Sequence, residues 1–102
     1  MPYQPTGTPL TDEEREILDI LQEECAEVIL AVSKIKRFGR RNINPKTDVD
    51  NVLELSLEVG DLDTIRAIAQ SAGLIEERAV HQGRARKIER LREFSNINLG
   101  DL

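Results

Sequence analysis

The chain has 102 residues, a net charge of −5, 32% charged residues and only 3% aromatic residues. This length predicts a single domain, and the acidic balance argues against a general nucleic-acid-binding protein, whose surface would be basic. The single cysteine excludes an internal disulfide, and no apolar run is long enough to span a membrane. Since no signal-peptide pattern is visible either, we expect a soluble, cytoplasmic helical protein with a core of Leu, Ile, Val and Ala.

The N-terminal part of the chain predicts an extended arm followed by a long helix. Residues 1–10 hold three of the four prolines and are expected to form the arm. The helix is predicted over residues 12–37, where apolar residues recur at helical spacing. Thr11 and Glu14 have the spacing of a capping box at its start, and Gly39 is a suitable stop.

Three carboxylates, Glu23, Glu24 and Glu27, interrupt the apolar stripe of this first helix. Helical phase places Glu24 inside the stripe, Glu27 at its edge and Glu23 slightly further out, and it places Cys25 in the expected core. A buried, unpaired carboxylate costs several kcal/mol, so we expect a divalent cation such as Mg²⁺ to compensate. Lys34 lies on the acidic side, either as a solvated charge or as a contact to a phosphate.

Breaks in the pattern divide the rest of the chain into a loop, two helices and a tail. These segments are a loop over 40–46, a helix capped by Thr47 or Asp48 and ending near 72–73, a helix over 76–94, and a frayed tail over 95–102. Residues 11–94 therefore form the expected domain. Its core is small, so oligomerisation would help to stabilise it.

The second helix repeats the inward placement of acids. Glu58 and Asp61 are three residues apart and project between apolar positions, as do the acids of the first helix. We expect the two helices to face each other and to bring these acids into one cluster. Asn51 lies on the same face, either as a substrate contact or as a local cap. Two acid-rich solvated helices, paired with Lys or Arg, are the alternative.

The last helix carries cations on its inward face. Lys87 falls in the middle of its apolar stripe, with Arg84 one turn earlier. These residues would bind the phosphates of a nucleotide or, alternatively, pair with Glu58 or Asp61 in a protein that holds no metal.

The paired acidic motif, Glu23-Glu24-x-x-Glu27 followed by Glu58-x-x-Asp61, resembles that of the MazG-like all-α nucleoside triphosphate pyrophosphohydrolases. The flanking runs 25–29 and 33–39 resemble the phage-type and small bacterial members. The resemblance covers residues 17–94, and the gap between the two motifs is at the long end for this family. It implies an all-α bundle of three to four helices, completed by dimerisation, in which the first two are antiparallel and the third packs across them.

The resemblance also implies an activity, the hydrolysis of a (d)NTP to (d)NMP and pyrophosphate, which clears unwanted nucleotides from the pool. The implied ligands of Mg²⁺, or alternatively Mn²⁺, are Glu24, Glu27, Glu58 and Asp61. Glu23 would be the catalytic residue that orients or deprotonates water. The implied substrate contacts are Lys34, Asn51, Arg84 and Lys87. The expected partners are the nucleotide and further copies of the chain, in a homodimer or homotetramer, with no nucleic acid and no membrane.

Two alternative functions stay open at the level of sequence. One is a sibling activity of the same fold, such as hydrolysis of dUTP, dCTP or phosphoribosyl-ATP. The other is a non-enzymatic helical interaction protein whose acidic face binds a basic partner. A di-iron carboxylate bundle is disfavoured, because neither acidic helix offers a His three residues after a Glu.

Overall fold

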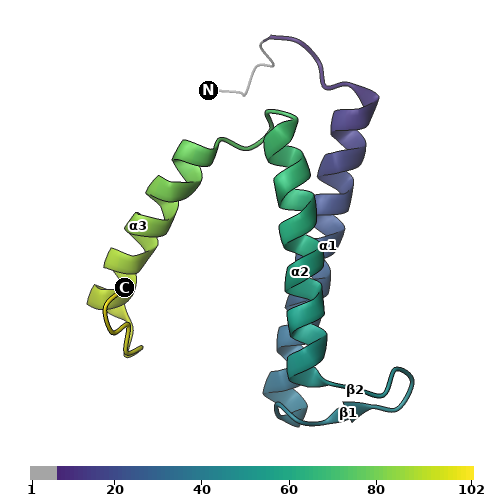
Figure 1. The fold of residues 1–102 in the computed structure, drawn as a ribbon, viewed down its shortest axis with the longest axis vertical. Coiled ribbons are helices and arrows are strands. Elements are labelled where there is room, and N and C mark those ends of the chain that lie inside the picture. Colours follow the sequence, from purple (N-terminus) through teal and green to yellow (C-terminus); the bar gives the residue numbers. More distant parts are fainter. Residues whose placement is uncertain (1–6) are drawn as a thin grey trace, which may run out of the picture.

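The computed structural model describes residues 7–102 and is all-α apart from one short hairpin (Figure 1). Its elements are α1 (Asp12–Phe38), β1 (Ile43–Asn44), β2 (Val49–Asp50), α2 (Asn51–Ser71) and α3 (Glu77–Phe94). The expected all-α fold of three helices is confirmed. Part of the expected N-terminal arm, residues 1–6, lies outside the described residues. Within the described residues, no helix has the length and apolar character needed to cross a membrane.

The capping box predicted for the first helix is present. The Thr11 hydroxyl accepts a hydrogen bond from the Glu14 backbone N–H at 3.1 Å, and the Glu14 carboxylate accepts one from the Thr11 N–H at 2.8 Å. At the other end, Gly39 has a φ of 88° and donates its N–H to the Ile35 carbonyl at 2.8 Å. Because only glycine adopts such a φ without strain, the helix stops where the sequence indicated.

The expected loop over 40–46 and the expected cap of the second helix were both wrong in detail. Ile43–Asn44 pairs antiparallel with Val49–Asp50, so the segment forms a small hairpin. Thr47 and Asp48 lie in its turn, where their N–H groups donate to the Asn44 carbonyl at 3.3 and 2.8 Å. They are therefore unable to cap α2, and Asp50 caps it instead, with its carboxylate accepting from the Leu53 N–H at 2.8 Å.

The helices α1 and α2 run antiparallel, side by side, and their contact contains the core (Figure 1). Ile17 of α1 packs with Ile65 and Ala69 of α2 in a buried cluster at one end of the pair. Partly buried apolar residues surround this cluster, namely Ile20, Leu21, Leu62, Ala72, Leu74 and Ile75. The core prediction was wrong for Cys25, which is exposed because its part of the apolar stripe lies beside the α1–α2 contact and not within it.

The third helix departs from the expected arrangement, because it leads away from the helix pair and does not pack across it (Figure 1). No residue of α3 is buried. Its connection to α2 is short and turns at Gly73, with a φ of 79°. Leu74 and Ile75 then pack against the core cluster, so the start of α3 is anchored while the helix itself extends outward.

Candidate functional site

Three carboxylates from the two paired helices meet in one cluster. Each of Glu24, Glu58 and Asp61 offers an oxygen that lies within 4.8 Å of the others. Glu24 comes from α1, while Glu58 and Asp61 are one turn apart on α2, so the antiparallel packing brings them together. Glu24 and Glu58 are half-buried between the helices, and Asp61 is exposed. We call these three residues the acid cluster.

The electrostatics of the acid cluster are unfavourable to its charged form. Partial burial raises the pKa of Glu24 above its ordinary value of 4.5, and the charges of Asp61, Glu27 and Glu23 raise it further. The pKa of Glu58 is raised in the same way, first by burial and then by Asp61, Glu27 and Glu24. Each carboxylate therefore makes ionisation of its neighbours more costly.

No described residue forms an ion pair with the acid cluster, and the nearby cation Lys34 is paired with Glu54. None of the ion pairs between described residues involves Glu24, Glu58 or Asp61, nor the neighbouring Glu23 and Glu27. Glu27 and Glu23 are both exposed, beside the cluster and not within it. The salt-bridged acidic helices considered as an alternative are thus absent at these five positions. The roles of metal ligand for Glu27 and of catalytic residue for Glu23 stay predictions.

Two hollows adjoin the acid cluster. The larger, of about 440 Å³, is lined by two cluster carboxylates and four neighbouring side chains, namely Glu24, Asp61, Ile20, Thr64, Ile65 and Ile68. The smaller, of about 190 Å³, is lined by Glu54 and Glu58 together with Thr47, Val49 and Leu57. The cluster therefore borders one mainly apolar hollow and one that contains a further carboxylate.

This further carboxylate, Glu54, is a site residue to which the sequence analysis gave no role. Lys34 of α1 donates a hydrogen bond to its Oε1 at 2.8 Å, and this bond is the main reason why the pKa of Lys34 is raised. The other oxygen of Glu54, Oε2, is buried and has no hydrogen-bond partner among the described residues. Its spacing of four residues before Glu58 was the available signal, because it places both acids on one helix face.

Asn51, predicted as a substrate contact or a local cap, links the end of α1 to the start of α2 through its side chain. Its side chain is only 2% exposed, and its amide donates to the carbonyls of Gly39 at 2.9 Å and Lys34 at 3.4 Å. The amide thus ties the end of α1 to the start of α2. Of the two roles left open, this geometry favours the local one.

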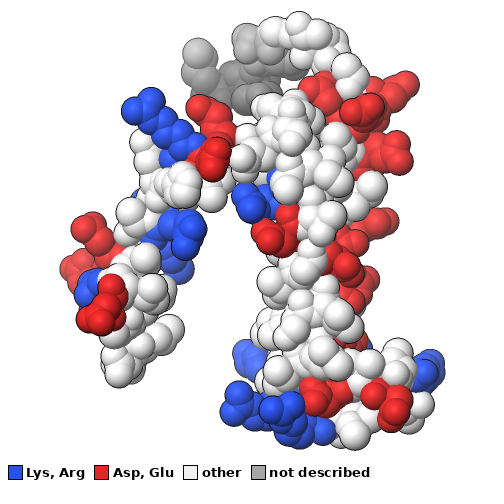
Figure 2. Space-filling view, in the orientation of Figure 1, with Lys and Arg blue, Asp and Glu red and all other residues white. Residues whose placement is uncertain are grey.

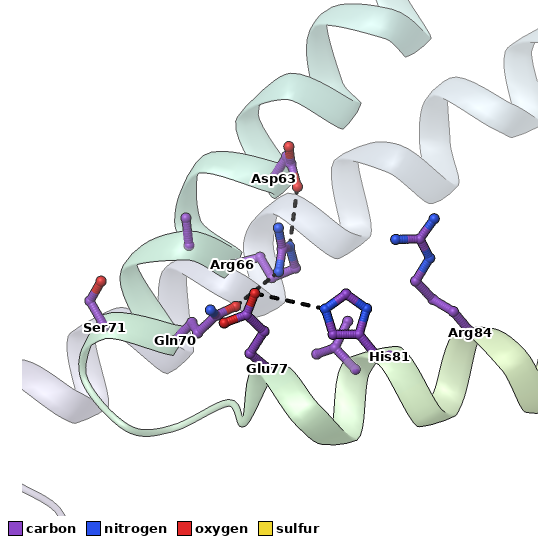
Figure 3. A pocket seen from close by; sticks show the side chains of 9 residues that line it. Asp63, Arg66, Gln70, Ser71, Glu77, His81 and Arg84 are labelled. Atoms are coloured by element: carbon purple, nitrogen blue, oxygen red, sulfur yellow. Dashed lines mark hydrogen bonds and ion pairs between the residues drawn. The ribbon is translucent and has the colours of Figure 1, made fainter.

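The structure does not bring Arg84 and Lys87 to the acid cluster within one chain. Arg84 extends from α3 into a separate hollow of about 510 Å³ between α2 and α3 (Figure 3). Arg66 lines the same hollow and pairs with Asp63 at 3.1 Å. Asp63 is two residues from Asp61, and residues two apart point in different directions from a helix. The pairing of Arg84 or Lys87 with Glu58 or Asp61, offered as an alternative, is likewise not formed among the described residues.

The site therefore consists of the acid cluster, the Lys34–Glu54 pair and two adjoining hollows, all on one side of the α1–α2 pair. The charges of Glu27 and Glu23 also act on Glu24. Compared with known proteins, the chain matches no family model, no curated protein and no solved structure.

Proposed function

We propose that this chain is a metal-dependent nucleoside triphosphate pyrophosphohydrolase of the MazG-like all-α type. The observation that carries the proposal is the acid cluster, whose three carboxylates offer oxygens within 4.8 Å of one another and form no ion pair with the described residues. The resemblance of the two acidic motifs supports the same activity.

The residues present fit a divalent cation. Mg²⁺ prefers carboxylate oxygens, and the half-buried pair of Glu24 and Glu58 with Asp61 supplies three of them. The unpartnered Oε2 of Glu54 adds one acceptor next to Glu58. When bound there, Mg²⁺ would polarise phosphoryl oxygens and lower the pKa of a bound water. Mn²⁺ would serve through the same ligands.

Two further charged side chains, Glu23 and Lys34, would act on the attacking water and on the phosphates of the nucleotide. Glu23 is exposed beside Glu24, and its carboxylate would accept a proton from the attacking water. The water oxygen would bond to the α-phosphorus, and the bond from that phosphorus to the bridging oxygen would break and release pyrophosphate. Lys34 is protonated at neutral pH, and its hydrogen bond to Glu54 raises its pKa further, so it would offset negative charge on the phosphates.

The larger hollow would accept the nucleoside. Its walls include the side chains of Ile20, Ile65 and Ile68, which suit the face of a base, while Glu24 and Asp61 lie at the same hollow. A nucleotide placed there has its apolar part against the helices and its phosphates near the acid cluster. This placement involves no named contact to the sugar, so the test below should include both deoxy- and ribonucleotides, with dUTP and dCTP among them.

The test is pyrophosphate release from canonical and modified nucleotides, with Mg²⁺ and with EDTA. Wild-type protein should yield monophosphate and pyrophosphate only with the metal. Asp61→Asn should lower the rate about 100-fold or more, since several kcal/mol of charge stabilisation depend on the metal and about 1.4 kcal/mol is tenfold. Asp63→Asn is the matched control, because it removes an acid of the same helix outside the cluster and should leave the rate unchanged.

A second readout separates metal binding from turnover. Mg²⁺ should raise the Tm of the wild type and have little effect on Glu58→Gln, because a ligand that binds only the folded state stabilises it. If no nucleotide is hydrolysed and Mg²⁺ also leaves the Tm unchanged, the proposal fails. The acidic face would then fit the interaction protein considered above.

A further inference from the structure

Lys34 lies where the acidic part of α1 meets the basic end of the helix pair. All eight acids of α1 precede it, the last of them Glu27, and Lys36 and Arg37 follow it. Figure 2 shows acidic side chains along the α1 side of the pair and basic ones gathered at the hairpin end. Lys34 is therefore the first cation that follows the acidic part of α1.

The acids in and beside the acid cluster act on this lysine. The pKa of Lys34 is raised first by its hydrogen bond to Glu54 and then by charge, to which Glu27 and Glu58 contribute as well as Glu54. Glu27 is seven residues earlier, which is two turns along the same helix face. Long side chains of a helix lean toward its N-terminus, which for α1 is the direction of Glu27. A lysine left free at this position would thus be drawn toward the acid cluster.

Glu54 holds the lysine instead. The Lys34 ammonium donates a hydrogen bond to Oε1 of Glu54 at 2.8 Å, and none of the ion pairs between described residues joins it to the acid cluster. Glu54 lies on α2, one turn before Glu58, which is about 6 Å along the helix axis. The flexible four-carbon stem of a lysine can cover such a distance. The bond to Glu54 thus decides with which of two neighbouring acids the lysine pairs.

The surroundings of Glu54 favour this bond. Its side chain is 23% exposed, against 41% for Lys34, and its Oε2 is buried without a hydrogen-bond partner among the described residues. A half-buried carboxylate in this position depends on its one cation, because an unpaired buried charge is costly. The pair should therefore persist in solution, unlike fully exposed pairs, which contribute little.

A lysine inside the acid cluster would compete with a metal ion. Its N–H groups would occupy carboxylate oxygens that Mg²⁺ requires, and its charge would cancel part of the negative charge that attracts the ion. This competition is strong at Glu24 and Glu58, which are half-buried, because opposite charges attract each other more there than in water. The acid cluster therefore binds a divalent cation better when the lysine is held elsewhere.

We propose that Glu54 is a positioning residue, which holds Lys34 beside the acid cluster and keeps its ammonium off the carboxylates that bind the metal. This role rests on the proposed function, since it assigns the cluster to a divalent cation. The same bond leaves the ammonium at the edge of the cluster, where it meets the phosphates of a metal-bound nucleotide. A pair that only tied α1 to α2 would matter for stability and not for metal binding.

The test is the affinity of the purified full chain for Mg²⁺ alone, measured by calorimetry on the wild type, Glu54→Met, Lys34→Met and the double variant. Glu54→Met frees the lysine, whereas the Lys34→Met background has no lysine to free. Loss of the Glu54 charge is common to both backgrounds and cancels when the two effects are compared. Glu54→Met should weaken Mg²⁺ binding at least about tenfold more in the presence of Lys34 than in its absence, because the freed ammonium competes for the carboxylates.

Asp63→Asn is the matched control for this cycle. Asp63 is an acid of the same helix, and its loss frees a cation, Arg66, outside the acid cluster. Because this pair is exposed and its charges are screened, the variant should weaken Mg²⁺ binding by less than about threefold. The helical circular dichroism and the metal-free Tm of each variant show whether it has folded and how much the Lys34–Glu54 pair contributes to stability.

Two results would overturn the role of Glu54 while the proposed function stands, with a wild type that binds Mg²⁺ and hydrolyses nucleotides. Equal effects of Glu54→Met in both backgrounds would mean that Glu54 acts on the metal directly. An unchanged Mg²⁺ affinity with a lowered Tm would mean that the pair only ties the helices together. A wild type that does not bind Mg²⁺ would overturn this role and the proposed metal site together.

Discussion

Replacement of Asn51 by alanine tests whether this residue holds the fold together or binds substrate. The side chain is 2% exposed, and its amide donates to the carbonyls of Gly39 and Lys34, so the substitution leaves carbonyl groups at the junction of α1 and α2 without these donors. An unsatisfied buried group costs about 1–3 kcal/mol. For a chain of this size, the Tm should therefore fall by about 4–8 °C for each kcal/mol lost.

The assay is thermal and urea unfolding of Asn51→Ala at a fixed protein concentration, together with KM for the nucleotide that is hydrolysed. Asn42→Ala is the control, because Asn42 is an exposed residue of the neighbouring segment. Surface substitutions of this kind change stability by less than about 0.5 kcal/mol. We expect Asn51→Ala to be destabilised with an unchanged KM. A variant as stable as the control but with a raised KM would refute the structural role and assign Asn51 to substrate binding.

Three further predictions concern charged residues. Asp50→Ala should lower the Tm by several degrees and Asp50→Asn by less, because asparagine also caps a helix but carries no charge for Arg41. Since the Leu53 N–H and Arg41 lower the pKa of Asp50, the contribution of its charge should be present above its ordinary pKa of 3.8 and be lost in acid below it. In EDTA, the stability of the wild type should fall as the pH rises above 4.5. The reason is that the raised pKa values of Glu24 and Glu58 make the folded state bind protons more tightly than the unfolded state does. In thermal unfolding, Glu58→Gln should flatten this pH dependence. Lys34→Met should lower the Tm of the metal-free protein, since Glu54 loses its partner; an unchanged Tm would mean that Lys34 contributes only to substrate binding.

Local signals in the sequence predicted the helices well. The boundaries of α1 follow from the capping box at Thr11 and from Gly39, both of which act within one turn of the chain. The start of α2 was predicted a few residues early. Thr47 and Asp48 are good caps by residue type, but pairing of the two short strands places them in a turn, and pairing depends on contacts between segments.

The acid cluster was predictable for a similar reason, whereas its surroundings were not. Glu24, Glu58 and Asp61 each interrupt an apolar stripe, so helical phase alone turns them toward the partner helix. The pairing of Lys34 with Glu54 depends on the register between α1 and α2, which no local pattern fixes. The position of α3 depends on the backbone angle at its connection to α2, which no side-chain pattern within the helix determines. The sequence therefore predicted the helix and its apolar face, but not the direction in which the helix extends.

The acid cluster joins two helices that are separated by a hairpin, and this has a consequence for folding kinetics. Glu24 lies on α1, whereas Glu58 and Asp61 lie on α2, so the repulsion between the helices arises only when the two helices pair. Replacement of a cluster carboxylate by a neutral amide removes part of this repulsion. Refolding in EDTA should therefore be faster for Glu58→Gln than for the wild type, because pairing of the helices meets less repulsion in the variant.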